Sequence, residues 1–87
     1  MKVAVWDTYV RRTDGRLMHF DIVVPEHEKN ERTIYRYGNE YLITKHILSA
    51  TLTTNQCTFC HIEDATDTVR RDIETKGYHI VQIENCE

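Results

Sequence analysis

The sequence contains little glycine and proline, with three Gly and one Pro among 87 residues. Such a low content excludes collagen-like repeats and low-complexity linkers. Long apolar runs are also missing: the longest covers residues 3–6, far short of the ~20 residues that a membrane-spanning helix needs. Hydrophobic residues still make up 40% of the chain. We therefore expect one globular domain over residues 1–87.

The chain also lacks a surplus of positive charge, since 11 Lys and Arg stand against 14 Asp and Glu, for a net charge of −3. Proteins that bind nucleic acid or anionic membranes normally draw on such a surplus. We therefore expect no nucleic-acid or membrane partner. A protein or a small molecule is the expected partner, and the chain is expected to be a monomer or a weak homodimer.

The first residues show neither the apolar stretch of ~7–15 residues nor the cleavage site of a secretory signal. This predicts a cytoplasmic location. Three cysteines are an odd number, and a reducing compartment keeps thiols free, so we expect no disulfide.

Alternation of apolar residues predicts strands at 2–10 and 16–24, joined by a turn at Asp14-Gly15 into an antiparallel hairpin. Helical spacing predicts a helix over 30–46, within which Gly38 suggests a close approach to the sheet. Residues 49–52 are expected to connect this helix to a capped turn, in which Gln56 reaches back to Thr53. A second helix is predicted over 65–76, capped by Asp64 or Thr66 and ended by Gly77.

Short strands are predicted at 59–63 and 78–85. In the first of these, Phe59, His61 and Glu63 are expected on one face, with Cys60 and Ile62 on the other. The order β-β-α-β-α-β predicts an α/β (α+β) two-layer sandwich, with two helices on a mixed sheet of about four strands. One continuous core under both helices is expected, formed by Trp6, Phe20, Ile22, Ile34, Tyr41, Leu42, Val69, Ile73 and Ile80.

The segment 57–61, with the sequence CTFCH, is the most distinctive motif. Its pattern is that of covalent haem attachment, but a cytoplasmic chain this small does not suit haem. A redox dithiol is disfavoured because the pair would follow a helical turn, where the dipole opposes a thiolate. Cys57, Cys60 and His61 form a candidate metal set, which zinc would complete with Cys86, His19 or His79. The plainer interpretation is that the cysteines are small buried hydrophobic residues and that no cofactor is bound.

A second polar group is expected on one face of the sheet. Alternation places Asp7 with Tyr9, and His19 with Asp21, on neighbouring strands of the hairpin. If the strand at 59–63 pairs next to the strand at 16–24, His61 and Glu63 share that face. Histidine among carboxylates forms acid–base pairs, and such clusters mark functional sites. The alternative is a solvated outer face.

These segments resemble a known family. The chain carries VAVWDTYV at 3–10, MHFDI at 18–22, CTFCHIE at 57–63, and Gly77-Tyr78 with a late Cys86. This combination resembles the small bacterial domains classed as DUF2024. The resemblance implies a small α/β fold and a bacterial cytoplasmic setting, but no biochemical activity and no catalytic residues. Two interpretations of function therefore stay open: a binding or interaction module without chemistry, and a zinc or acid–base site at the CTFCH cluster with His19 and Asp21.

Overall fold

The computed structural model describes residues 1–47 and 52–87. Its elements are β1 (Lys2–Arg11), β2 (Leu17–Pro25), α1 (Glu31–Thr44), β3 (Cys57–Asp64), α2 (Asp67–Lys76) and β4 (His79–Glu84). The predicted order β-β-α-β-α-β is confirmed. Most of the predicted connection at 49–52 lies outside the described residues. Neither helix in the described part of the chain has the length and apolar character needed to cross a membrane.

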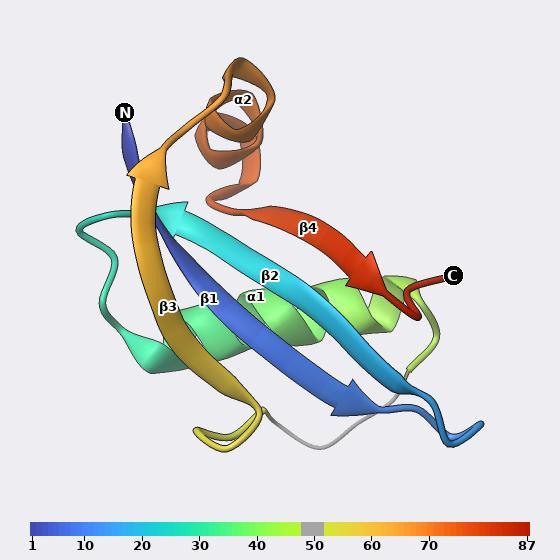
Figure 1. Ribbon diagram of the computed structural model, residues 1–87. Helices are drawn as coiled ribbons and strands as arrows, with labels where there is room; N and C mark the ends of the chain where they lie inside the picture. The colour runs from blue at the N-terminus through green and yellow to red at the C-terminus, as the bar shows by residue number, and fades with distance from the viewer. Residues whose placement is uncertain (48–51) are drawn as a thin grey trace.

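All strand pairs in the sheet are antiparallel, so the predicted mixed sheet is wrong. The strand order is β3-β1-β2-β4, with the β1–β2 hairpin in the middle and one later strand on each side (Figure 1). The chain leaves β2, passes through α1 and returns beside β1, whose direction is opposite to that of β2. β3 runs in the same direction as β2, so pairing these two strands would have given the mixed sheet. β3 pairs instead with β1, which runs in the opposite direction, and the pair is antiparallel.

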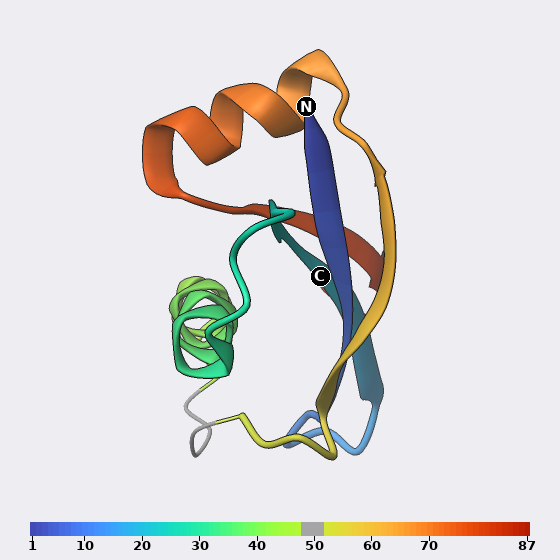
Figure 2. The same ribbon diagram turned by 90° about the vertical axis from the view of Figure 1, so that its left-hand side faces the viewer.

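The helices cover different faces of the sheet, so the predicted two-layer arrangement is wrong and the core is split accordingly. Ala4 packs in the cluster that contains the buried residues of α1, whereas its neighbours Val3 and Val5 pack with Ile73 of α2. Adjacent strand residues point to opposite faces, so α1 and α2 cannot share one. Figure 2 shows α1 beside the sheet and α2 across its upper end. The expected single core under both helices is therefore wrong: Val69 and Ile73 belong to a second, smaller cluster.

The larger core lies between α1 and the sheet. Its largest fully buried members are Phe20, Met18, Ile22, Ile34 and Leu42. Gly38 of α1 is also buried, and a Cβ built on it would lie 2.8 Å from Ile22 Cδ1 and 2.5 Å from Leu52 Cδ1. The close approach of helix to sheet that Gly38 suggested is confirmed.

Local signals set the ends of the helices, and those of α2 are the predicted ones. Asn30 caps α1 by accepting a hydrogen bond from the Arg32 N–H, and Thr66 caps α2 by accepting one from the Val69 N–H. Gly77 ends α2 in the left-handed region, with φ 98°. In the turn before β3, the Gln56 side chain accepts a hydrogen bond from the Thr53 N–H at 3.1 Å, as the capping-box pattern predicted.

A β-bulge separates the two halves of β3. Phe59 pairs with Trp6 and His61 pairs with Val5, so Cys60 is the extra residue between them. The bulge puts Phe59 on the α1 face with Ile62, and His61 on the other face. The expected grouping of Phe59 with His61 and Glu63 is therefore wrong for Phe59, because an inserted residue shifts the alternation by one.

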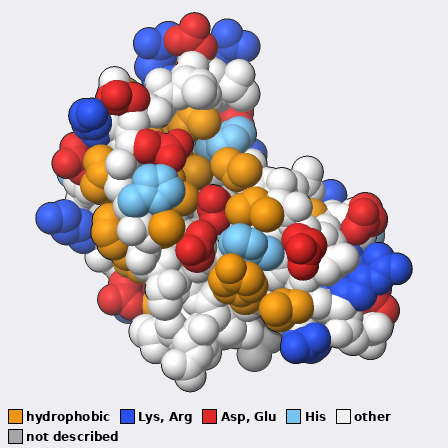
Figure 3. Space-filling view, viewed as in Figure 1, with side chains coloured by type: hydrophobic (Ala, Val, Ile, Leu, Met, Phe, Trp, Pro, Cys, Tyr) orange, Lys and Arg blue, Asp and Glu red, His pale blue; other side chains and the backbone are white. Residues whose placement is uncertain are grey.

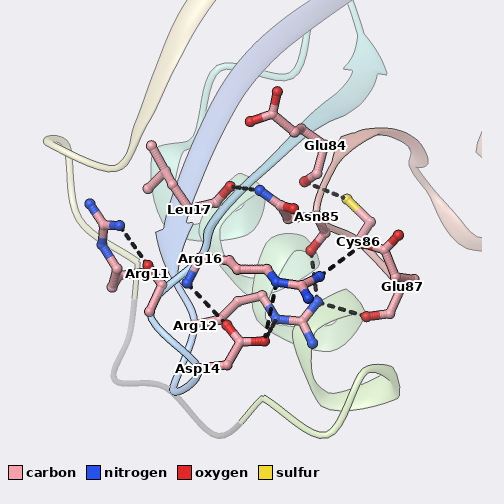
Figure 4. Close-up of polar contacts among 10 residues, drawn as sticks. Arg11, Arg12, Asp14, Arg16, Leu17, Glu84, Asn85, Cys86 and Glu87 are labelled. Atoms are coloured by element: carbon pink, nitrogen blue, oxygen red, sulfur yellow. Dashed lines mark hydrogen bonds and ion pairs between the residues drawn. The ribbon is translucent and has the colours of Figure 1, made fainter.

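The end of the chain is held against the β1–β2 turn (Figure 4). Arg12 Nη1 donates hydrogen bonds to the carbonyl oxygens of Asn85 and Glu87, both at 2.7 Å. Asn85 Nδ2 donates to the carbonyl oxygen of Leu17 at 2.8 Å. These contacts fix the last residues beside the start of β2, close in sequence to His19.

Candidate functional site

The sheet face not covered by α1 carries the predicted polar residues. Asp7 pairs directly with Asp21, and Tyr9 pairs directly with His19, across β1 and β2. Directly opposite residues of an antiparallel pair lie on the same face. These four residues are therefore brought together, as the alternation predicted. Figure 3 shows histidine and acidic side chains gathered on this face among apolar ones.

The closest group on this face consists of Asp7, His19 and Asp21. One potential ligand atom from each residue lies within 4.8 Å of the others. His19 Nε2 is 3.6 Å from Asp7 Oδ1 and 3.7 Å from Asp21 Oδ1. These separations exceed ordinary N–H···O hydrogen-bond lengths of about 2.7–3.2 Å. The three groups thus converge on one point without bonding to one another through these atoms.

Two of these atoms are buried and have no hydrogen-bond partner among the described residues. They are His19 Nε2 and Asp21 Oδ1. Buried polar side-chain atoms normally find a partner, and an exception calls for an explanation such as a bound ion. The Tyr9 ring stacks on the His19 ring, with centroids 4.1 Å apart and planes 13° from parallel. This stacking holds the imidazole over the two carboxyl groups.

The electrostatics of the two carboxyl groups are opposite. Burial, followed by the contact with Asp7, raises the pKa of Asp21 to about 6. The pKa of Asp7 is lowered, chiefly because Asp21 hydrogen-bonds to it. Two like charges placed directly opposite each other on neighbouring strands destabilise a sheet. Below about pH 6 a proton on Asp21 therefore relieves the repulsion, whereas at neutral pH most Asp21 is ionised and the two carboxylates face each other as like charges.

The bulge brings Cys60 to the same face. The Cys60 thiol lies close enough to the Asp7 carboxylate for each group to shift the pKa of the other, and Cys60 Sγ lies 3.1 Å from His61 Nδ1. The second ring nitrogen, His61 Nε2, is 2.6 Å from Glu63 Oε1. Sequence analysis placed Cys60 on the opposite face from His61, because a bulge leaves no signal in the alternation of one short strand.

Cys60, His61 and Glu63 have the connectivity of a nucleophile, a base and an orienting carboxylate. The chemistry does not follow, because burial and the nearby Asp7 carboxylate raise the pKa of the Cys60 thiol. A reactive cysteine requires the opposite shift. His61 and Glu63 thus share the face of His19 and Asp21 as a separate, exposed pair. They reach it through β1 and not through the β2 pairing considered from sequence.

The predicted metal set of Cys57, Cys60 and His61 is not brought together. Cys57 is 1% exposed and packs in the α1 core, where the Thr8 hydroxyl donates to its Sγ at 3.4 Å. Cys60 and His61 lie on the other face. Cys86 is also buried, with its thiol donating to the His19 carbonyl oxygen at 3.3 Å. Within the described residues, the only group with metal-ligand spacing is the one formed by Asp7, His19 and Asp21.

Comparison with known proteins identifies the family. The model of the "Domain of unknown function (DUF2024)" family matches residues 1–83. The chain belongs to the DUF2024 family. It is also similar to protein NE1680 from Nitrosomonas europaea, a structural genomics target solved by NMR, with 36% identity, full coverage of both chains and a TM-score of 0.83. No curated protein matched the chain. The resemblance seen in the sequence is confirmed, and it brings no established activity with it.

Proposed function

We propose that this DUF2024 protein binds a divalent transition-metal ion through Asp7, His19 and Asp21, and that this ion is zinc. The observation that carries the proposal is the pair of buried, unpartnered atoms, His19 Nε2 and Asp21 Oδ1, which converge with Asp7. An interaction module without chemistry, the other interpretation of the sequence, leaves these atoms unexplained. The proposal keeps the zinc interpretation but moves its centre from the cysteines to the β1–β2 hairpin.

The spacing of the three groups suits such an ion. Ligands at 2.0–2.2 Å from a tetrahedral zinc are ~3.3–3.6 Å apart, by simple geometry. The observed separations from His19 Nε2 are 3.6 and 3.7 Å. One imidazole and two carboxylates are ligands that zinc accepts. Binding would also offset the repulsion between the two opposed carboxylates, both of which are mostly ionised at neutral pH.

Three protein ligands leave one coordination position open, as in catalytic rather than structural zinc sites. Cys60 is one candidate for that position, because its thiol lies close to the Asp7 carboxylate. Water is the alternative. Cobalt substitution decides between them, since a Co²⁺–thiolate bond gives an intense charge-transfer absorption that is absent in a Cys60→Ser variant and absent throughout if water fills the position.

The test of the proposal is calorimetric titration of chelator-treated protein with zinc. The wild type is expected to bind one equivalent, and Asp21→Asn and His19→Gln are each expected to bind at least tenfold more weakly. Glu63→Gln is the matched control, since it removes a carboxylate from the same face outside the three-residue group. No stoichiometric binding by the wild type, or equal binding by all four proteins, would contradict the proposal.

A further inference from the structure

A pocket of about 450 Å³ lies on the α1 face of the sheet, on the opposite side from Asp7, His19 and Asp21. It lies where β1 and β3 meet the loop that leads into α1. Its volume is in the range of small-molecule sites, which is about 300–1,000 Å³. The lining residues are Ala4 and Trp6 of β1, Phe59 and Ile62 of β3, and Glu26, Glu28 and Lys29 of the loop.

The wall of this pocket is aromatic and incompletely covered. Trp6 and Phe59 meet edge to face, with centroids 5.8 Å apart and planes at 74°. Phe59 is 51% exposed and Ile62 is 42% exposed, although both lie on the face that α1 otherwise covers. Exposed aromatic and aliphatic side chains around a cavity are typical of ligand sites. The bulge at Cys60 is what turns Phe59 toward this pocket.

One polar atom of the pocket residues lacks a partner. The indole Nε1–H of Trp6 is buried and makes no hydrogen bond to the described residues. A buried donor without an acceptor costs about 1–3 kcal/mol. A ligand atom that accepts this hydrogen bond would remove that cost.

The rim of the pocket is acidic overall. Glu26 and Glu28 stand against one cation, Lys29. Glu28 Oε1 accepts a hydrogen bond from the Asn30 N–H at 3.0 Å, which holds that carboxylate in place at the start of α1. A fixed negative rim over an aromatic wall favours ligands with a positive end.

We infer that this pocket binds a small aromatic cation, a ring that carries a hydrogen-bond acceptor and, a short chain away, a protonated amine. The ring would pack on Trp6, Phe59 and Ile62. The acceptor would take the Trp6 indole N–H, and the ammonium group would lie near Glu26 and Glu28. This inference does not depend on the metal site, because the two sites are on opposite faces and share no residue.

Two probes of matched shape and opposite charge test the inference: tyramine and 3-(4-hydroxyphenyl)propionate. Trp6 is the only tryptophan of the chain, so its fluorescence reports on this pocket alone. Tyramine is expected to change that fluorescence saturably and to bind at least fivefold more tightly than the propionate. Tighter binding of the anion, or no saturable change with either probe, would overturn the inference.

Variants then measure how much each contact contributes to tyramine binding. Binding is measured by calorimetry, because a Trp6 variant has lost the fluorescence signal. Trp6→Phe keeps a ring but deletes the donor, and Phe59→Ala removes a half-exposed wall; each is expected to weaken tyramine about tenfold. Glu26→Gln is expected to weaken it about two- to fivefold, while Glu74→Gln, on the exposed side of α2, leaves it unchanged. Equal binding by Phe59→Ala and the wild type would place tyramine elsewhere and overturn the inference, even if Trp6→Phe fails to fold.

A second copy of the chain is the competing occupant of this face, because β3 is an edge strand. Sedimentation at the concentrations of the titration distinguishes the two. A monomer that binds tyramine supports the inference. A dimer that buries Phe59, shown by loss of association in Phe59→Ala, contradicts it.

Discussion

The two faces of the sheet are built from the same strands but carry different chemistry. On the α1 face, Val10, Met18, Phe20, Ile22 and Val24 are at most 2% exposed. On the other face, Asp7, His19 and Asp21 alternate with those residues and are only partly covered. The α1 face concentrates the burial that stabilises the fold. The other face can therefore carry polar groups that contribute nothing to the core.

The second face is itself divided. At one end, Val3, Val5 and Val23 are covered by α2. Farther along the same strands the apolar residues give way to the Asp7, His19 and Asp21 group, which neither α1 nor α2 covers. The boundary lies within β1, between Val5 and Asp7. A short helix at one end of a sheet thus leaves a partly sheltered polar area at the other, where burial and charge can act together on a carboxyl group.

The largest expected difference between the faces is in thiol accessibility. Cys57 lies in the α1 core and Cys60 is exposed on the other face. A thiol reagent reaches Cys57 only through opening of the fold, so in native protein Cys60 should react at least about a thousandfold faster than Cys57. Mass spectrometry of partly labelled protein measures both rates. Equal rates at Cys57 and Cys60 would show that Cys57 is not buried in the α1 core.

The next largest effect is on stability when the two clusters are truncated in turn. Phe20→Ala empties a fully buried position in the α1 core and should lower the free energy of unfolding by ~3–5 kcal/mol. Ile73→Ala, in the smaller cluster and already 8% exposed, should cost less, ~2–3 kcal/mol. Urea denaturation measures both. A larger loss for Ile73→Ala would mean that α2, rather than α1, covers the main core.

Gly38 gives a third comparison, between the propensity of a helix and its packing. Alanine is intrinsically better than glycine inside a helix by up to ~1 kcal/mol. Here the added Cβ would meet Leu52 and Ile22, so Gly38→Ala should instead destabilise by ~1–3 kcal/mol. Asn39→Ala, next to it on α1 and not fully buried, is the control for propensity alone. A more stable Gly38→Ala protein would show that α1 can move away from the sheet.

Local features of this fold could be predicted from the sequence because their signals are local. The Asp14-Gly15 turn, the Thr66 cap and the left-handed Gly77 each act within a few residues, and all three lie where expected. The face shared by Asp7, Tyr9, His19 and Asp21 followed from alternation within one hairpin.

The rest depended on contacts between distant parts of the chain. The pairing of β3 with β1 rather than β2 joins distant segments, and the alternation within β3 is compatible with either neighbour. The bulge at Cys60 adds one residue between two pairs, and it reverses the expected side of Phe59. The metal set that CTFCH suggested therefore joined two cysteines that lie on opposite faces: Cys57 is a core residue, whereas Cys60 lies near Asp7.

The smallest effect, and the one most specific to the polar face, is the pH dependence that Asp21 confers. Its pKa is raised to about 6, because it is buried and faces Asp7. An unfolded aspartate has a pKa of about 3.9, so the folded state holds this proton more tightly than the unfolded state does. Such a group stabilises the fold fully below about pH 4, and this contribution is lost as the pH rises through about 6.

Asp21→Asn keeps the shape of the side chain and removes the titration. In chelator-treated protein it should therefore raise the free energy of unfolding at pH 8 by about 1 kcal/mol, a value reduced because water partly screens the pair. At pH 4 most of the gain should vanish, since Asp21 is then protonated in the folded state and about half protonated in the unfolded state. Asp64→Asn, whose exposed carboxylate pairs with Lys2, is the control and should not stabilise the protein at pH 8. Urea denaturation at both pH values measures the difference, and a gain that is the same at pH 4 and pH 8 would mean that opposed carboxylates are not its cause.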